Sequence, residues 1–352
     1  MRVAFVSMET TQHRDTEGAR RLERVAEQFA DAGHDVSVYC ARWWDSDQRT
    51  FEPDSVTYRA VTASPNPVAF AARLPVRLAR RPPDVIHASP RPPCGVVGAG
   101  VGGTVTRAPV VVDWYGDEGI DGARLADRAA RSPDCVVTPS ELVRTSVRER
   151  GASSDRTRIV PESIDVDQIR ETDPADTVDV AFAHPLDESA NVESLLLGLA
   201  ELREKDWSAK IVGDGPVRED YERQASDLRI DDRVEFVGAC DRAERISIYR
   251  GAHVFVQTAY REYFATELLW ALACGCIGIV EYQAHSSAHE LIEHRERSFR
   301  VTSTQQMADA IVEAGSFDHE TIDDSLADFD HDAVRQQYRD CYEDLIEAHG
   351  VL

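Results

Sequence analysis

Lysine is almost missing from this sequence. Of its 39 basic residues only Lys205 and Lys210 are lysines, which leaves 37 arginines against 63 acidic residues and a formal net charge of −24. A chain this acidic repels the phosphate backbone of nucleic acids, so we expect no nucleic-acid binding. An acidic surface that keeps arginine but not lysine indicates a halophilic protein, because concentrated salt, with a Debye length of about 3 Å at 1 M, screens the self-repulsion. An ordinary acidic cytosolic protein is the alternative.

Long hydrophobic runs and paired cysteine motifs are also missing. No apolar run approaches the ~18 residues that a membrane span needs, and residues 1–7 resemble a strand more than a targeting leader. We therefore expect a cytoplasmic protein. The seven cysteines are scattered without C-x-x-C spacing, so neither a disulfide framework nor a zinc site is expected. No metal ligand set and no cofactor motif is predicted.

Short apolar runs alternate with helical periodicity along the whole chain. In the first half, strands are predicted at residues 2–6, 35–39, 84–88, 110–114, 135–138 and 158–160. In the second half, strands are predicted at residues 178–183, 209–212, 234–237, 254–257, 276–280 and 299–301. Strands that alternate with helices of about 10 to 15 residues indicate parallel sheets wound on both faces. The predicted fold class is α/β, with two Rossmann-like doubly wound sheets.

A polar stretch rich in aspartate, residues 162–177, separates the two series of strands. We therefore predict a first domain over residues 1–165 and a second over 175–330, with a last helix within 333–352. Ligands of doubly wound sheets bind at the carboxyl ends of the strands. A cleft between the two domains is the expected site.

Eight segments in order along the chain carry a family resemblance. They are residues 17–39, 83–89, 136–151, 158–168, 186–202, 210–225, 232–240 and 261–282. Together they resemble the glycosyltransferases of family 4, which have the GT-B architecture of two Rossmann-like domains facing across a cleft. The resemblance implies a retaining, metal-independent transfer of a sugar from a nucleotide-diphosphate donor, with the first domain on the acceptor side and the second binding the nucleotide sugar. It also implies that the final helix, 333–352, packs back on the first domain.

Helix amino termini suit such a donor because their unpaired N–H groups and positive dipole ends hold phosphate. The resemblance implies a role in catalysis for Glu262, which would hold donor hydroxyls. The donor-binding positions that it implies are Gly18, Gly213, Asp214, Gly215, Gly238, Tyr263, Phe264, Ala265 and Thr266. His184, where the family has glycine, either faces the cleft or merely ends a strand.

Three positions depart from the family pattern. Pro185 and Ala190 stand where the family has its Arg and Lys, and Trp270 stands where it has the second acid of its E-x7-E motif. Glu267 lies on nearly the same helix side as Trp270, so replacement by this neighbour is conceivable. Other cations would then have to compensate, and the candidates are Arg14, Arg20, Arg21 and Arg261. A catalytically degenerate protein that serves as a binding or scaffold partner in glycan assembly is the alternative.

Residues 55–112 are basic in this acidic chain, with seven arginines and one acid, Asp84. Within them, residues 68–81 mix apolar side chains with four arginines. Such a segment favours peripheral contact with an anionic membrane, at its inner face, and hence a polyprenyl-lipid or glycan acceptor. The alternative is a core-facing helix with a solvated arginine face.

Overall fold

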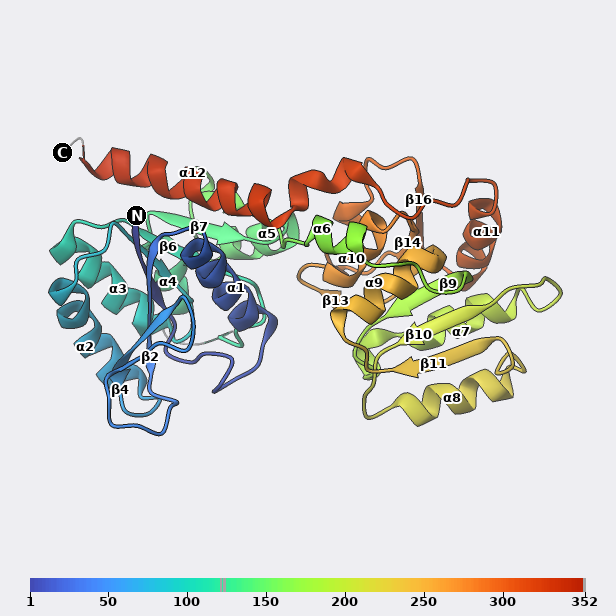
Figure 1. The fold of residues 1–352 in the computed structure, drawn as a ribbon, viewed down its shortest axis with the longest axis horizontal. Coiled ribbons are helices and arrows are strands. Elements are labelled where there is room, and N and C mark those ends of the chain that lie inside the picture. The colour runs from blue at the N-terminus through green and yellow to red at the C-terminus, as the bar shows by residue number, and fades with distance from the viewer. Residues whose placement is uncertain (121, 123–124, 351–352) are drawn as a thin grey trace. The chain divides into compact units, whose positions relative to one another are not determined.

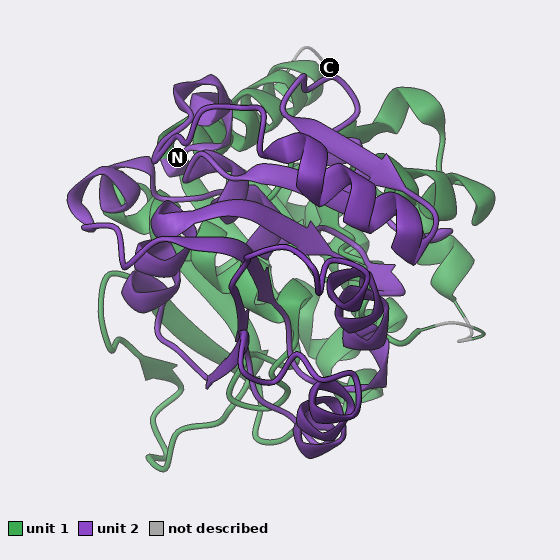
Figure 2. Ribbon diagram, turned by 90° about the vertical axis from the view of Figure 1, so that its right-hand side faces the viewer, with its two compact units in different colours: residues 1–162, 332–352 green, residues 163–331 purple. Residues whose placement is uncertain are grey.

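The computed structural model describes residues 1–120, 122 and 125–350. The chain divides into two compact units, residues 1–162 with 332–352 and residues 163–331 (Figure 2). Residues 351 and 352, which the predicted final segment included, lie outside the described residues. In the part of the chain that is described, no helix is long and apolar enough to cross a membrane.

The first unit is built on one sheet with the strand order β3-β4-β2-β1-β5-β6-β7-β8 (Figure 1). Its strands are β1 (Arg2–Val6), β2 (Asp35–Ala41), β3 (Thr50–Phe51), β4 (Thr57–Thr62), β5 (Val85–Ala88), β6 (Val110–Asp113), β7 (Cys135–Thr138) and β8 (Thr157–Ile159). All neighbours are parallel except β3 and β4, which pair antiparallel at the edge. The doubly wound sheet predicted for this half is thus confirmed, but β3 and β4 were missed by the sequence analysis.

The helices of the first unit connect these strands. They are α1 (Glu17–Asp31), α2 (Pro67–Arg80), α3 (Pro93–Thr106), α4 (Ala126–Arg131), α5 (Glu141–Glu149) and the final helix α12 (His331–Gly350), with a short 3-10 turn at Ser154–Arg156. Helix α1 begins where the Thr16 side chain accepts the amide of Ala19. Its apolar face packs into the same core as the strands β1 and β2.

Helix α2 contains Pro75 and nevertheless continues as one helix. A proline leaves the carbonyl four residues earlier, here that of Ala71, without its helical donor. Gly98 of α3 lies against that carbonyl so closely that a Cβ built on it would be 2.7 Å from the oxygen. The glycine-rich helix α3 therefore packs directly on the backbone of α2.

Helix α12 is fastened to the first unit by polar contacts inside the core. Tyr338 donates its hydroxyl hydrogen to Asp113 at 2.6 Å, and the hydroxyl of Tyr342 is hydrogen-bonded to His87 at 2.5 Å. Both tyrosines are fully buried among the strands of the sheet. Helix α12 is consequently part of the core of this unit.

The second unit has a six-stranded parallel sheet with the order β11-β10-β9-β12-β14-β16. Its strands are β9 (Val178–Ala183), β10 (Ala209–Val212), β11 (Val234–Gly238), β12 (Ala252–Gln257), β14 (Ile277–Glu281) and β16 (Ser298–Val301), with a small separate pair, β13 (Arg261–Glu262) and β15 (His285–Ser286). Its helices are α6 (Val166–Glu171), α7 (Val192–Ala200), α8 (Arg218–Asp227), α9 (Arg242–Gly251), α10 (Thr266–Ala273) and α11 (Thr304–Ala314), with 3-10 turns at Glu188–Ala190, Ala288–Leu291 and Asp324–Phe329. All six main strands were predicted to within one or two residues.

Candidate functional site

Two glycines shape the turn that follows β10 in the second unit. Gly213 has a φ of +134°, and a Cβ on it would lie 2.0 Å from the carbonyl oxygen of His184. A Cβ on Gly215 would lie 2.2 Å from the carbonyl oxygen of Leu186. Asp214 caps this turn by accepting the amide of Gly215 at 2.8 Å. No other residue fits at 213 or 215, because the two loops at the carboxyl ends of β9 and β10 touch through their backbones.

Gly238 closes the neighbouring strand at the same end of the sheet. Its φ is +92°, and its carbonyl accepts the amide of Gly213 at 2.8 Å. The predicted donor residues Gly213, Asp214, Gly215 and Gly238 are thus brought together within the second unit. Their glycines let the loop backbones at this end of the sheet lie in direct contact.

Glu262 lies in β13, just beyond the carboxyl end of β12. Its Oε1 accepts a hydrogen bond from the Gln257 side-chain amide at 3.1 Å and lies 3.3 Å from Nε2 of His184. The backbone carbonyl of Glu262 accepts the amide of Ser287 at 2.8 Å. The other carboxylate oxygen, Oε2, has no hydrogen-bond partner among the described residues. The carboxylate is therefore fixed through one oxygen and open through the other.

His184 is positioned as a cation. Its Nδ1 lies 2.8 Å from the carbonyl oxygen of Pro185, while Nε2 faces the carboxylate of Glu262. Both partners are acceptors only, so the doubly protonated imidazolium makes both bonds. Burial opposes this charge, but the hydrogen bond and the negative charge of Glu262 outweigh burial and raise the pKa of His184. His184 directly follows β9, as one reading of this residue had it, and its imidazole also faces the Glu262 carboxylate.

Residues 263–266 lead from Glu262 into α10. The carbonyl of Tyr263 accepts the Ser287 hydroxyl at 2.9 Å, and Phe264 and Ala265 are buried. Helix α10 begins at Thr266 without a side-chain cap. The first amides of a helix have no acceptor within the helix, and here the Thr266 amide donates instead to the carbonyl of Phe264 at 2.9 Å.

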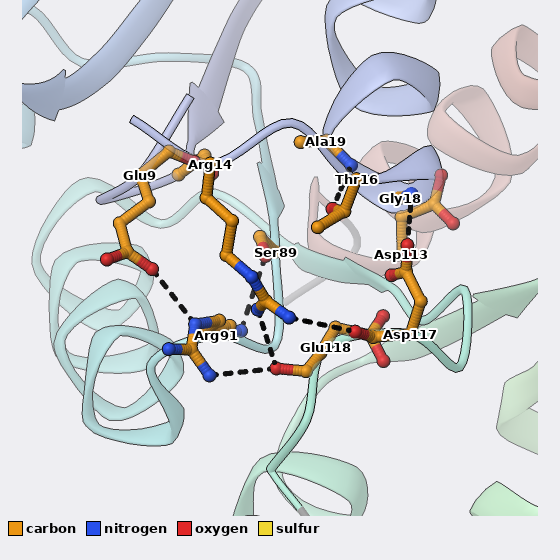
Figure 3. Close-up of a pocket in the computed structure, with 11 residues that line it drawn as sticks. Glu9, Arg14, Thr16, Gly18, Ala19, Ser89, Arg91, Asp113, Asp117 and Glu118 are labelled. Atoms are coloured by element: carbon orange, nitrogen blue, oxygen red, sulfur yellow. Dashed lines mark hydrogen bonds and ion pairs between the residues drawn. The ribbon is translucent and has the colours of Figure 1, made fainter. Parts of the chain in front are cut away.

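In the first unit, a pocket opens at the carboxyl ends of β1, β5 and β6 (Figure 3). Arg14 and Arg91 both point to the backbone carbonyl of Glu118, to which they donate at 3.1 and 2.9 Å. Arg91 also donates to Glu9 at 2.9 Å. Gly18, at the start of α1, lines the same pocket, but its amide donates to the carboxylate of Asp117 at 3.1 Å. An acid of the chain itself thus occupies this helix terminus.

Glu118 is a buried acid on the wall of this pocket. Burial, together with the negative charge of Asp117, raises the pKa of Glu118 to about 8, although the backbone amides of Tyr115 and Gly116 donate to its carboxylate. A carboxyl group that titrates near neutral pH is therefore available here. The sequence analysis missed Arg91, Asp117 and Glu118, whose only signal was their place just after predicted strands.

Two family matches were found along the sequence. Residues 18–168 match the family described as Glycosyltransferase Family 4, and residues 165–316 match Glycosyl transferases group 1. Together they cover the chain from 18 to 316. The chain belongs to these glycosyltransferase families.

Solved structures of similar fold agree with this membership. A glycosyltransferase from Rickettsia africae superposes with a TM-score of 0.76 at 13% identity, covering 98% of each chain. HepE of Anabaena, crystallised with UDP, superposes with a TM-score of 0.76 at 18% identity, covering 98% of this chain and 100% of that one. At such identities the likeness shows the GT-B type of fold.

A curated relative matches a short part of the sequence. It is an alpha-monoglucosyldiacylglycerol synthase of Streptococcus pneumoniae, 31% identical over 87 residues. The match spans 24% of this chain and 20% of the length of that enzyme.

Two of the arginines suggested as compensating cations in this glycosyltransferase are otherwise engaged. Arg21 is 2% exposed, and its guanidinium is paired with Asp113 and Glu162 at 3.1 Å inside the first unit. It cannot reach a ligand, and that prediction was wrong. Arg20 is exposed but held by two salt bridges of 2.6 Å, to Asp15 and Glu17.

The remaining two candidate cations differ from these. Arg14 lines the pocket of the first unit, as described above. Arg261, beside Glu262, is exposed and has no ion-pair partner among the described residues.

Glu267 does not replace the second acid of the E-x7-E motif, which is missing at Trp270. Its carboxylate accepts from Arg242, Arg245 and the Tyr249 hydroxyl, at 3.2, 2.5 and 2.6 Å. The side chain therefore points into the contact between α10 and α9. Trp270 is 5% exposed, and the Arg242 guanidinium lies 4.7 Å from its ring centre. It is a core residue.

Proposed function

We propose that this chain transfers a sugar from a nucleotide-diphosphate donor to a lipid-linked or surface-glycan acceptor, with retention of anomeric configuration and without a metal. Family membership supports the reaction class. The UDP and UDP-glucose complexes of HepE support the donor class, and the lipid named for the Streptococcus enzyme supports the acceptor class. No group of three or more metal-ligating side chains occurs among the residues that the structure describes.

The arrangement around Glu262 is the observation that carries the proposal. Oε1 is fixed by Gln257 and His184, so Oε2 is held in place to accept hydroxyl groups of the donor sugar. Preorganised acceptors of this kind cost no reorganisation when the substrate binds. The glycine turns at 213–215 and 238 would take the base and ribose.

The diphosphate would lie at the start of α10. Amides of its first turn beyond Thr266 would supply donors, and Arg261 would supply the positive charge that Pro185 and Ala190 do not. The departing diphosphate is stabilised by these groups, and attack from the same face of the sugar gives retention.

Gly18 remains part of the proposal with one condition. Because its amide donates to Asp117, a phosphate at the start of α1 would have to displace that carboxylate.

The test is titration calorimetry with a panel of nucleotide sugars, combined with transfer assays, on the folded chain and on Glu262→Gln. We expect heat from at least one donor. The variant should lose about ten- to hundredfold in transfer, the equivalent of a lost hydrogen bond to a charged group of about 1.5–3 kcal/mol. Glu219→Gln, on the exposed face of α8, is the matched control and should behave as the unmodified chain. No heat from any donor would leave the scaffold role in glycan assembly instead.

We also propose that the acceptor side contacts an anionic membrane through residues 68–81. Helices α2 and α3 pack together, and four large apolar side chains on them are exposed: Val68, Val76, Val101 and Val105. Exposed apolar groups beside arginines are the combination that binds the interface of an anionic bilayer. Flotation with anionic vesicles should weaken in a Val68→Ser, Val76→Ser variant. Unchanged flotation would refute the contact.

A further inference from the structure

A second basic feature of the first unit is a pocket between α2 and one face of the sheet. It is lined by residues of β2, β3, β4 and the end of α2, and it encloses about 670 Å³, its open mouth included. Its polar lining includes Tyr39, Arg49, Arg59, Arg77, Arg80 and Arg81. No acidic residue lines it, although the chain has 63 of them. This arginine pocket shares no residue with the sites around Glu262 and Glu118, but Arg77, Arg80 and Arg81 also belong to the segment 68–81 proposed above to contact a membrane.

The arginines of the pocket are incompletely neutralised. Among the described residues only Arg81 of this pocket has an acidic ion-pair partner, Asp35, at 2.6 Å. Arg59 donates to the Ser37 hydroxyl, a neutral group. Arg77 has no partner among the described residues, and burial, followed by the charges of its arginine neighbours, lowers its pKa. Like charges gathered in one pocket repel each other, and a bound anion would remove that repulsion.

Unused hydrogen-bond donors lie in the same place. Tyr39 is 3% exposed and lines the pocket, yet its hydroxyl has no hydrogen-bond partner in the described part of the chain. Nε of Arg81 is buried and also unpartnered. Buried polar groups are almost always satisfied, so Nε of Arg81 indicates an acceptor from outside the chain, and the Tyr39 hydroxyl is a free donor beside it.

We propose that the arginine pocket binds a phosphorylated ligand that carries at least two negative charges. Guanidinium groups bind phosphate oxygens in pairs of parallel hydrogen bonds, and the tyrosine hydroxyl adds a neutral donor. The phosphate is either the headgroup of a lipid or a free phosphate compound. The same recognition chemistry serves both.

Titration calorimetry with pyrophosphate tests the site. Arg77→Gln and Arg49→Gln should each weaken binding about tenfold or more, and Tyr39→Phe about two- to tenfold. Arg73→Gln is the matched control, because Arg73 is an exposed residue of the same helix, outside the pocket, and its loss changes the net charge equally. An equal loss in Arg73→Gln, or no loss in Arg77→Gln, would overturn the proposal, as would an absence of pyrophosphate binding.

Vesicles distinguish the two sources of the phosphate. Flotation on phosphatidate vesicles that pyrophosphate competes with, and that Arg77→Gln abolishes, assigns the pocket to a lipid headgroup. Pyrophosphate binding without such competition assigns it to a free phosphate compound. Glu262→Gln should retain the pyrophosphate binding that depends on Arg77. Failure of the arginine pocket and failure of the proposed sugar transfer can therefore be told apart.

Discussion

The pair formed by His184 and Glu262 makes a prediction that depends on pH. In a double-mutant cycle, His184→Gln, Glu262→Gln and the double variant are compared by their free energies of unfolding. The two side chains are 12% and 19% exposed, so solvent screens their interaction little. A hydrogen bond between charged groups contributes about 1.5–3 kcal/mol. The N–O distance of 3.3 Å is long, which places the expected coupling energy at the lower end, about 1.5 kcal/mol.

The sign of the pH dependence of this coupling energy follows from the direction in which the pKa of His184 is shifted. The pKa of His184 is raised in the folded chain above its ordinary value of 6.5. The pair therefore contributes its full stabilisation below pH 6.5, where the histidine is protonated even in the unfolded chain. The contribution is lost as the pH rises through the folded pKa. Coupling should thus be largest in mildly acidic solution and decrease in alkaline solution.

Urea unfolding followed by tryptophan fluorescence measures the coupling, because Trp207 and Trp270 both lie in the core of the second unit. Measurements at about pH 5.5 and about pH 9 bracket the titration of the histidine. The reasoning fails if the coupling energy is the same at both pH values or is absent at the lower one. His285→Gln, a change to an exposed histidine of the same unit, should leave stability unchanged and serves as the control.

Three further substitutions test other parts of the structure. Asp113→Asn should lower the free energy of unfolding of the first unit by about 3–5 kcal/mol in urea titrations, because it leaves the charge of buried Arg21 incompletely paired. A loss below about 1 kcal/mol would contradict this reasoning. Gly215→Ala should lower the melting temperature and weaken nucleotide binding, since its Cβ would meet the carbonyl of Leu186; an unchanged melting temperature would show that the turn adjusts freely. Trp270→Glu, which restores the acid of the family motif, should lose about 3–5 kcal/mol of stability and gain no activity, while a gain in transfer rate would show that the position faces the donor.

The strands were predictable because parallel strands are buried on both faces and so read as continuous apolar runs. The residues 178–183 and 254–257 are of this kind. Strand β4 was missed because it lies next to the edge of its sheet and mixes buried with half-buried residues, Arg59 among the latter. A sequence segment of that composition is as compatible with a loop as with a strand.

The backbone of the site was predictable for a different reason. The turn at Gly213–Gly215 comes directly after a strand, and both this turn and Glu262 were expected from the family resemblance. Side-chain pairing was not predictable, because the partners are distant in sequence. Arg21 pairs with Asp113 and Glu162, which are 92 and 141 residues away. Helical periodicity places Arg21 on the apolar face of α1 with Val25 and Phe29, but it does not reveal the two distant acids that pair with it.

The ion-pair partners of the basic residues indicate different roles for them in this chain. Several exposed arginines of this chain, Arg73 and Arg107 among them, have no ion pair among the described residues, so a missing partner is informative only where an arginine lines a pocket. Arg21 is neutralised on all sides and maintains the core of the first unit. His184 is neutralised by the very carboxylate that we propose binds the donor sugar, which couples the charge of that site to pH. Arg77 is half-buried in the arginine pocket and has no ion-pair partner among the described residues, which is why we propose that an anion from outside the chain completes that site.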